Sequence, residues 1–253
     1  MTRPFVLVQL SDPHIGAVWA DGDPVAGLAA AVASVRSLLP RPDAVLVSGD
    51  LADHATDAEY EQVRELLAPL DAPLYVLPGN HDDRRMLHRH FGVPGADGEP
   101  VQYAAKLGAL RLVVLDTTRP GEDDGALDTE RLAWLDDALR AAPEAPTLLA
   151  MHHPPLRTGS PAWDEIGLAD VDRLALADVV ARHPQVRRLV AGHVHRAITA
   201  ELAGRVVLTV PSTYVQARLD FTSDTIELAA EPAGFAVHAV LDGDVTSHIQ
   251  PVH

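Results

Sequence analysis

Short apolar segments alternate with amphipathic segments along most of the chain, and each apolar segment ends in a small or polar residue. Apolar runs of this length are typical of buried β-strands, whereas the amphipathic segments repeat with the period of an α-helix. We expect strands at residues 5–10, 44–49, 73–79, 110–116, 147–152 and 187–193. We expect helices at residues 25–39, 58–67, 129–141 and 171–183. The alternation predicts βαβ units and therefore an α/β fold.

The last third of the chain has a different pattern. The segments AITAELAGRVVLTVPS and AVHAVLDGDVTSHI alternate apolar and polar residues around Ala203-Gly204 and Asp242-Gly243, which are typical turn pairs. We expect a second, largely antiparallel sheet in this region. Because the sequence shows no repeat, low-complexity tract or linker, we treat residues 1–253 as one domain.

The composition excludes several classes of protein. Asp and Glu number 36 against 20 Lys and Arg, and the formal charge of −16 repels polyanions, so we expect no nucleic-acid partner. No apolar run approaches the roughly 18 residues of a membrane helix, and the segment MTRPFVLVQL lacks a cleavable signal pattern. We therefore expect a cytoplasmic protein with no membrane partner. Because cysteine is absent, a metal site would have to use His, Asp, Glu or Asn.

Side chains able to bind metal follow five of the predicted strands. In chain order they are Asp12 and His14, Asp50, Asn80 to Asp82, His152 and His153, and His193 and His195. Ligands of open α/β sheets bind at the carboxyl ends of the strands, so these residues should meet there. The D-x-H and H-x-H spacings would place alternate side chains on one side of an extended backbone.

Each of these motifs alone is explained equally well by a turn or a helix cap. Their joint occurrence is harder to explain in that way, because so many carboxylate, amide and imidazole groups in one place need cations to neutralise them. The sequence therefore predicts a metal site.

The ordered set D-x-H, G-D, G-N-H-D, H and G-H-x-H, from Asp12 to His195, resembles the calcineurin-like metallophosphoesterase superfamily. The segments GNHD, HHPPLRTGSPAWD and VPSTYVQ are similar to those of bacterial class III cyclic nucleotide phosphodiesterases and related glycerophosphodiesterases. The resemblance implies a four-layer α/β/β/α sandwich with two central mixed β-sheets. His14 and Asp53 disfavour the purple acid phosphatase branch, which has other residues at these two positions.

The resemblance also implies a ligand set for two metal ions. One ion would be bound by Asp12, His14 and His195 and the other by Asn80, His152 and His193, with Asp50 bridging the two. With nitrogen and oxygen ligands and no thiolate, Mn²⁺, Fe²⁺/Fe³⁺ or Zn²⁺ are the expected ions. A hydroxide that bridges them would attack phosphorus in line with the leaving group.

Other residues receive roles from the same resemblance. His81 would protonate or stabilise the leaving oxygen, as an imidazole can do near neutral pH, although it could instead only cap the following helix. Asp53 would orient His81, or be an ordinary turn carboxylate. Residues 157–163 form a loop that could contact a nucleoside or a glycerol group, or be a plain surface loop. We expect His153 to point away from the site and to pack. The remaining histidines expected on the surface are His88, His90, His183, His238, His248 and His253.

The predicted function is a dinuclear metal-dependent phosphodiesterase of small molecules, with 3′,5′-cyclic nucleotides such as cAMP as the favoured substrates. A glycerophosphodiesterase, or a broad-specificity phosphomonoesterase and diesterase, is the alternative among enzymes. A non-catalytic phosphate-binding protein with the same fold is the alternative outside them. A homodimer is compatible with each of these.

Overall fold

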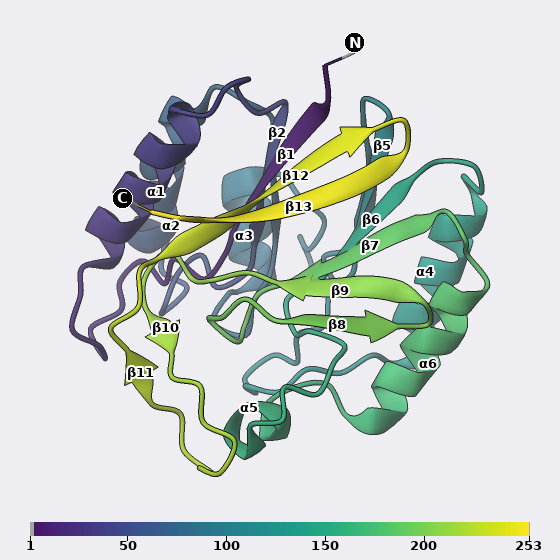
Figure 1. Cartoon of the computed structure of the whole chain (residues 1–253). Helices are drawn as coiled ribbons and strands as arrows, with labels where there is room; N and C mark the ends of the chain where they lie inside the picture. The colour runs from purple at the N-terminus through teal and green to yellow at the C-terminus, as the bar shows by residue number, and fades with distance from the viewer. Residues whose placement is uncertain (1–2, 253) are drawn as a thin grey trace.

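Two mixed β-sheets form the centre of the structure (Figure 1). The computed structural model describes residues 3–252. The first sheet has the order β13-β12-β1-β2-β3. Its strands are β1 (Phe5–Leu10), β2 (Ala44–Ser48), β3 (Leu74–Leu77), β12 (Gly234–Leu241) and β13 (Asp244–Pro251). The second sheet has the order β4-β5-β6-β7-β9-β8. Its strands are β4 (Tyr103–Leu107), β5 (Leu110–Val114), β6 (Thr147–Ala150), β7 (Val186–Ala191), β8 (Thr199–Leu202) and β9 (Arg205–Thr209).

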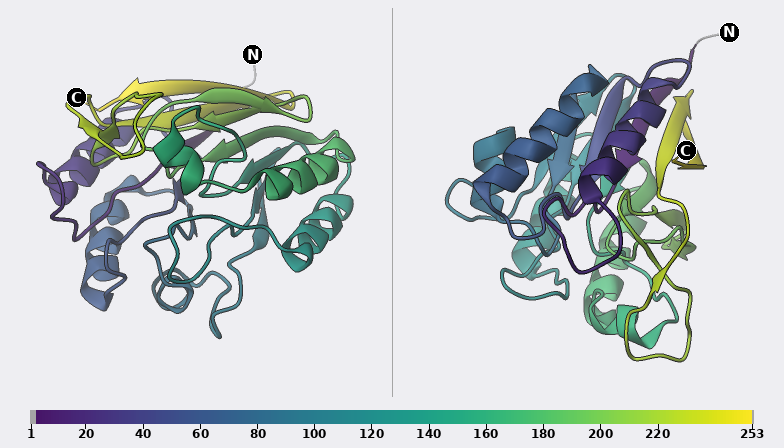
Figure 2. Two further views of the ribbon diagram at one scale, coloured as in Figure 1. Left: turned by 90° about the horizontal axis from the view of Figure 1, so that it is seen from below. Right: turned by 90° about the vertical axis from the view of Figure 1, so that its left-hand side faces the viewer.

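Helices cover the outer faces of both sheets and lie on opposite sides of the molecule (Figure 2). The first sheet is covered by α1 (Pro24–Arg36), α2 (Asp57–Leu67) and α3 (Arg84–Phe91), with a 3₁₀ turn, η1 (Ala68–Leu70), after α2. The second is covered by α4 (Thr129–Arg140) and α6 (Asp170–Ala181), and a short α5 (Pro161–Glu165) precedes α6. The predicted four-layer sandwich is confirmed. Within residues 3–252, no helix is long and apolar enough to cross a membrane.

Successive residues of the central strands face two different apolar layers. In β2, Val45 and Val47 pack beneath the helices, whereas Leu46 packs between the sheets with Leu112 and Leu148. Because both faces of these strands are buried, their sequences are continuous apolar runs instead of alternating patterns. All six predicted strands are confirmed, and each begins and ends within a few residues of its expected position.

The prediction of a separate antiparallel sheet in the last third of the chain is wrong. β12 pairs antiparallel with β1, and β9 pairs parallel with β7, so the C-terminal strands extend the two existing sheets. The physical reason is that β1 and β7 would otherwise be edge strands with unpaired backbone groups, which the returning chain satisfies. A further two-stranded ribbon, β10 (Gln216–Ala217) and β11 (Leu228–Ala229), stands apart from both sheets.

Both predicted turn pairs are confirmed. Ala203 and Gly204 connect β8 to β9, and Asp242 and Gly243 connect β12 to β13. All four residues have positive φ, between 49° and 87°. Two-residue hairpin turns of this kind match the right-handed twist of the strands they join.

Replacing Leu112 by Ala should lower the free energy of unfolding by about 2–5 kcal/mol, because its side chain is fully buried between the sheets. The matched control is Leu174→Ala on α6, where the side chain is 69% exposed and the change should stay within about 0.5 kcal/mol. Urea unfolding with an unchanged slope measures both. Equal effects of the two substitutions would contradict the assignment of Leu112 to the layer between the sheets.

Candidate metal centre

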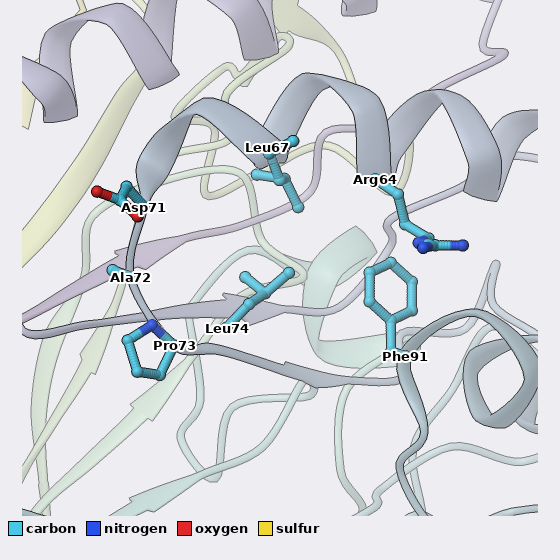
Figure 3. Close-up of a pocket in the computed structure, with 8 residues that line it drawn as sticks. Arg64, Leu67, Asp71, Ala72, Pro73, Leu74 and Phe91 are labelled. Carbon is cyan, nitrogen blue, oxygen red and sulfur yellow. The ribbon is translucent and has the colours of Figure 1, made fainter.

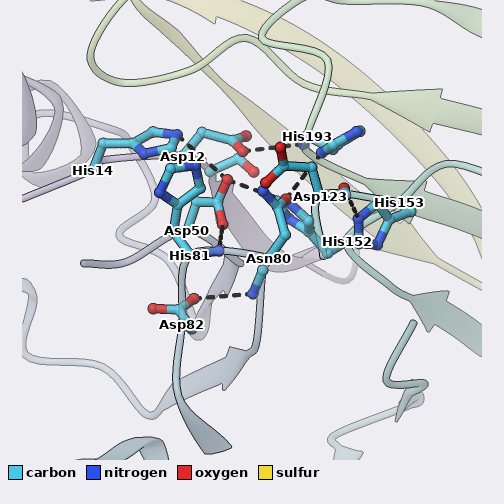
Figure 4. A network of polar contacts seen from close by, with 12 residues as sticks. Asp12, His14, Asp50, Asn80, His81, Asp82, Asp123, His152, His153 and His193 are labelled. Carbon is cyan, nitrogen blue, oxygen red and sulfur yellow. Dashed lines mark hydrogen bonds and ion pairs between the residues drawn. The ribbon is translucent and has the colours of Figure 1, made fainter. Parts of the chain in front are cut away.

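The structure brings all seven predicted ligands together at the carboxyl ends of strands from both sheets, and all of them except His195 are labelled in Figure 4. Asp12 and His14 follow β1, Asp50 follows β2, Asn80 follows β3, His152 follows β6, and His193 and His195 follow β7. One group, Asp12, His14, Asp50 and His195, offers ligand atoms within 4.8 Å of one another. In the other group, Asn80 Oδ1 lies 3.1 Å from His152 Nε2 and 3.2 Å from His193 Nδ1.

Backbone carbonyls fix the orientation of two of the imidazoles. His152 donates its Nδ1–H to the carbonyl of Ser48 at 2.9 Å. His195 donates its Nδ1–H to the carbonyl of Val215, also at 2.9 Å. Because a carbonyl oxygen can only accept, the Nε2 atom of each neutral ring carries a lone pair that is directed into the site.

The other two imidazoles are also held by hydrogen bonds to oxygen atoms, one to a carboxylate and one to a backbone carbonyl. His14 donates Nδ1–H to Asp53 Oδ1 at 3.0 Å, which leaves its Nε2 atom directed into the site. His193 has the opposite orientation, because its Nε2–H donates to the carbonyl of Ile166 at 3.1 Å and its Nδ1 atom faces Asn80. The ring nitrogen available for a metal is therefore Nδ1 in His193 and Nε2 in His14, His152 and His195.

If the rings are neutral, the atoms that face one another in the site are acceptors without protons between them. His14 Nε2 lies 3.1 Å from His195 Nε2. Asp12 Oδ2 is buried and has no hydrogen-bond partner among residues 3–252. Facing lone pairs and an unpaired carboxylate oxygen are unfavourable unless positive charge lies between them. The donor set, which consists of nitrogen and oxygen atoms, therefore fits divalent cations.

Asp50 lies between the two groups of ligands. Its Oδ2 atom is 3.4 Å from His14 Nε2 and 3.3 Å from His152 Nε2. Burial alone would raise the pKa of Asp50, but the imidazoles of His152 and His14 hold this pKa well below its usual range. Burial would lower the pKa of His152, and the Asp50 carboxylate raises it to about 9. Protons therefore compensate the Asp50 charge in the metal-free protein, and bound cations would replace them.

The backbone of five predicted ligands lies in the left-handed region. The φ angles are 51° at Asp12, 45° at His14, 52° at Asp50, 69° at His193 and 46° at His195. Non-glycine residues rarely adopt such angles, and their clusters mark functional sites. The predicted reason for convergence is therefore wrong in detail. The D-x-H and H-x-H segments are not extended backbone, because both end residues of each segment have positive φ, and both side chains of each pair reach the site.

Gly79 and Gly192 have no side chain, and the ligand carboxylates occupy the space that a side chain would fill. A Cβ atom on Gly79 would lie 2.1 Å from Asp50 Oδ1. A Cβ atom on Gly192 would lie 2.1 Å from Ser11 Oγ and 2.8 Å from Asp12 Oδ2. Any larger residue would displace a ligand, which explains why glycine precedes Asn80 and His193.

Asp82 lies beside the predicted ligands and joins two of the ligand loops. Its Oδ2 atom accepts the backbone N–H of Leu51 at 3.2 Å and of Gly79 at 2.9 Å. Its Oδ1 atom accepts the backbone N–H of Ala52 and the hydroxyl of Tyr60. Asp82 thereby fixes the loop after β2 to the loop after β3. Only the fold reveals this role, since three of the four donors lie 22 to 31 residues from Asp82 in the sequence.

His81 lies at the rim of the site, where its side chain is 33% exposed. Its Nδ1–H donates to the backbone carbonyl of Asp53 at 3.1 Å, and Nδ1 is 3.5 Å from the Asp53 carboxylate. That carboxylate instead accepts hydrogen bonds from His14 and from Trp19 Nε1, the latter at 2.9 Å. Asp53 therefore positions His14 through its carboxylate and His81 mainly through its carbonyl.

His153 packs beside the site, with its ring centroid 4.5 Å from that of His193. Both of its ring nitrogens are engaged. Nδ1 accepts from the hydroxyl of Thr117, and Nε2–H donates to the carbonyl of Asp123. Burial and the neighbouring His152 lower the pKa of His153 to about 3, so the ring is neutral. His153 therefore has no free lone pair for a metal.

The surface prediction is wrong for three of the described histidines. The His90 side chain is 6% exposed, with its ring stacked on Tyr60 and its Nε2 atom 2.9 Å from Asp57 Oδ1. His183 is buried and contacts Asp136 Oδ1 at 2.8 Å. His238 is fully buried between Ser247 Oγ and Gln9 Oε1. Hydrogen-bond partners allow all three rings to be buried. His253 lies outside the described residues.

A cavity of about 270 Å³ opens above the ligands. Its walls include five of the predicted ligands together with His81, Asp123 and the side chains of Trp19 and Trp163. A larger cavity of about 480 Å³ lies between α2, β3 and α3, where Arg64, Leu67 and Phe91 are among the lining residues (Figure 3). None of the described residues that line this larger cavity is a histidine, so the smaller cavity is the candidate reaction site.

Comparison with known proteins identifies the family. The family model described as calcineurin-like phosphoesterase matches residues 5–197. The chain belongs to this family. It is 36% identical over 228 residues to the 3′,5′-cyclic adenosine monophosphate phosphodiesterase CpdA of Pseudomonas aeruginosa, with 87% of this chain and 82% of that protein covered. It is 33% identical over 219 residues to the glycerophosphodiester phosphodiesterase GpdQ of Enterobacter lignolyticus, with 83% and 78% covered.

Solved structures show the same fold. A dimetal phosphatase from Danio rerio superposes with a TM-score of 0.72 at 17% identity over the full length of both chains. A purple acid phosphatase from yellow lupin, Lupinus luteus, superposes with a TM-score of 0.75 at 15% identity, covering all of this phosphoesterase and 52% of the lupin chain. At these identities the likeness concerns the fold alone.

Replacing Asp50 by Asn should reduce the bound metal from two ions per chain to one or none, because the bridging charge is lost while the shape is kept. Elemental analysis after metal loading and dialysis measures the content. The matched control is Asp57→Asn, an exposed carboxylate at the start of α2, and it should retain two ions. Two ions in the folded Asp50→Asn protein would refute the bridging role.

Proposed function

We propose that the chain is a dinuclear metal-dependent phosphodiesterase of small molecules, with 3′,5′-cyclic nucleotides such as cAMP as the favoured substrates. The observation that carries the proposal is the buried cluster of acceptor atoms around Asp50 beneath an open cavity. Family membership and the CpdA relative support it. Glycerophosphodiesters are the second candidate, because the GpdQ relative matches a similar share of the chain.

In this proposal the ligands are divided as the family pattern implies. Asp12, His14 and His195 bind one cation, Asn80, His152 and His193 bind the other, and Asp50 binds both. Mn²⁺, Fe²⁺/Fe³⁺ or Zn²⁺ suit these ligands. When bound, such cations supply Lewis-acid activation of water and positive charge beside the phosphoryl oxygens. The cytoplasmic location and the homodimer stay predictions.

Hydrogen bonds within the chain place His81 beside the bridging carboxylate. The backbone N–H of His81 donates to Asp50 Oδ1 at 3.0 Å, which fixes the rim loop to the bridging carboxylate. With its Nδ1–H bound to the Asp53 carbonyl, the imidazole of His81 has Nε2 left for the substrate. This nitrogen can hold the proton that the leaving oxygen requires.

Removal of the metal by a chelator should abolish hydrolysis of cAMP, and Mn²⁺ or Zn²⁺ should restore it. A panel of cAMP, glycerophosphoethanolamine and p-nitrophenyl phosphate at fixed metal content then ranks the substrates, and we expect the highest kcat/KM for cAMP. Absence of turnover with every divalent ion would support a non-catalytic phosphate-binding protein. Full activity of the metal-free protein would refute the mechanism.

Replacing His81 by Ala should retain both metals and lower the turnover of cAMP by about 10²- to 10⁴-fold, because the ribose oxygen is a poor leaving group. The loss on bis(p-nitrophenyl) phosphate should be much smaller, since nitrophenolate departs with little protonation. His88→Ala, at an exposed position of α3, is the control. Equal losses on both substrates would assign His81 to charge stabilisation instead, and loss of a metal would make it a ligand.

A further inference from the structure

One wall of the reaction cavity consists of aromatic and aliphatic side chains. The five residues are Trp19, Trp163, Ile166, Ile226 and Leu228. Aromatic residues make up only 4% of the sequence, yet two of its three tryptophans lie here. Trp19, Ile226 and Leu228 are 40–46% exposed. Exposed apolar surface beside a reaction site is typical of a surface that binds part of a ligand.

The α5 segment holds Trp163 against the metal centre. The indole meets the ring of His193 edge-on, with centroids 5.5 Å apart and an interplanar angle of 82°. The neighbouring Asp164 carboxylate accepts the backbone N–H of Thr158 at 2.7 Å, which closes the loop before the helix. The carbonyl of Ile166, at the end of the same segment, binds His193 Nε2. The indole therefore has a fixed position relative to the predicted ligands.

The β10–β11 ribbon supplies most of the aliphatic part of the wall. Ala217 in β10 pairs with Leu228 in β11, and the N–H of Ala217 donates to the carbonyl of His195. At the far end of the ribbon, the ring of Phe221 lies against Gly159 in the loop before α5. The loop that connects β10 to β11 passes beside α5 (Figures 1 and 2). The two halves of the wall are thus joined to each other and to the site.

The charge of the cavity restricts what this wall can bind. None of the described residues that line the cavity is Lys or Arg, and Asp123 adds a negative charge. A second phosphate placed against this wall would find no cationic side chain and would be repelled by Asp123. A flat, uncharged group attached to a singly charged diester needs no cationic side chain and is not repelled by Asp123.

We propose that the wall is a nucleobase-binding subsite in which the base stacks on Trp163, so that the site selects nucleoside phosphodiesters over glycerophosphodiesters. The inference rests on the proposed phosphodiesterase function and names the part of the substrate that this surface binds. Stacking of a base on an aromatic side chain corresponds to about 5- to 150-fold in affinity.

The test compares Trp163→Ala, Trp163→Phe and Trp134→Phe in the metal-loaded protein. Trp163→Ala should raise KM for cAMP by about 5- to 150-fold and lower kcat/KM for cAMP more than for glycerophosphoethanolamine. Trp163→Phe keeps an aromatic face and should recover most of the loss. Trp134 packs against the apolar cluster of the second sheet and does not line the cavity, so Trp134→Phe should leave the substrate ratio unchanged.

Product binding gives a readout that is independent of turnover. Calorimetry should show that the wild type binds adenosine 5′-monophosphate more tightly than ribose 5-phosphate, and that Trp163→Ala removes the difference. Equal affinities in the wild type, or equal losses on both diesters, would overturn the subsite. A base preference that depends on Trp163 in a protein that hydrolyses no diester would support the subsite and overturn the proposed function.

Discussion

A buried carboxylate between imidazole nitrogen atoms is the interaction on which the rest of the site depends. Asp50 lies within 3.4 Å of two imidazole nitrogens, and the nearby Asp12 Oδ2 has no partner among the described residues. Such an arrangement is stable only when protons or cations supply positive charge. Five of the predicted ligands have left-handed backbone, and glycines precede Asn80 and His193. Both features allow the ligand side chains to approach one another closely. The fold thus tolerates local strain in order to concentrate acceptor atoms.

The acceptor atoms can be gathered in one place because the sandwich aligns the ends of strands from two sheets. β1, β2 and β3 contribute ligands from one sheet, and β6 and β7 contribute ligands from the other. The backbone carbonyls that orient the ligand imidazoles lie in different segments from the imidazoles themselves. The carbonyl of Ser48 ends β2, that of Ile166 follows α5, and that of Val215 precedes the ribbon. The segments that orient the ligands also form the cavity walls, so the metal centre and the proposed base subsite are built together.

The predictable part of this arrangement is the part encoded locally. Continuous apolar runs predicted the buried strands, and the polar residues at their ends predicted which side chains converge. The partners of the C-terminal strands were not predictable, because hairpin patterns do not reveal which edge a hairpin joins. β4 alternates exposed and half-buried residues, and α3 (RRMLHRHF) is mostly polar, so neither has the apolar pattern of a core element. The wall residues Ile226 and Leu228 lie outside every motif and reach the cavity only through the ribbon.

The central claim is that this cluster of acceptors binds two cations. A crystal structure of the protein loaded with Zn²⁺ or Mn²⁺, with anomalous difference density recorded at the metal edge, tests it most directly. The account predicts two peaks about 3.5–4 Å apart, one beside Asp12, His14 and His195 and one beside Asn80, His152 and His193, with Asp50 in contact with both. Peaks outside this cluster, or a single peak in a fully active protein, would contradict it.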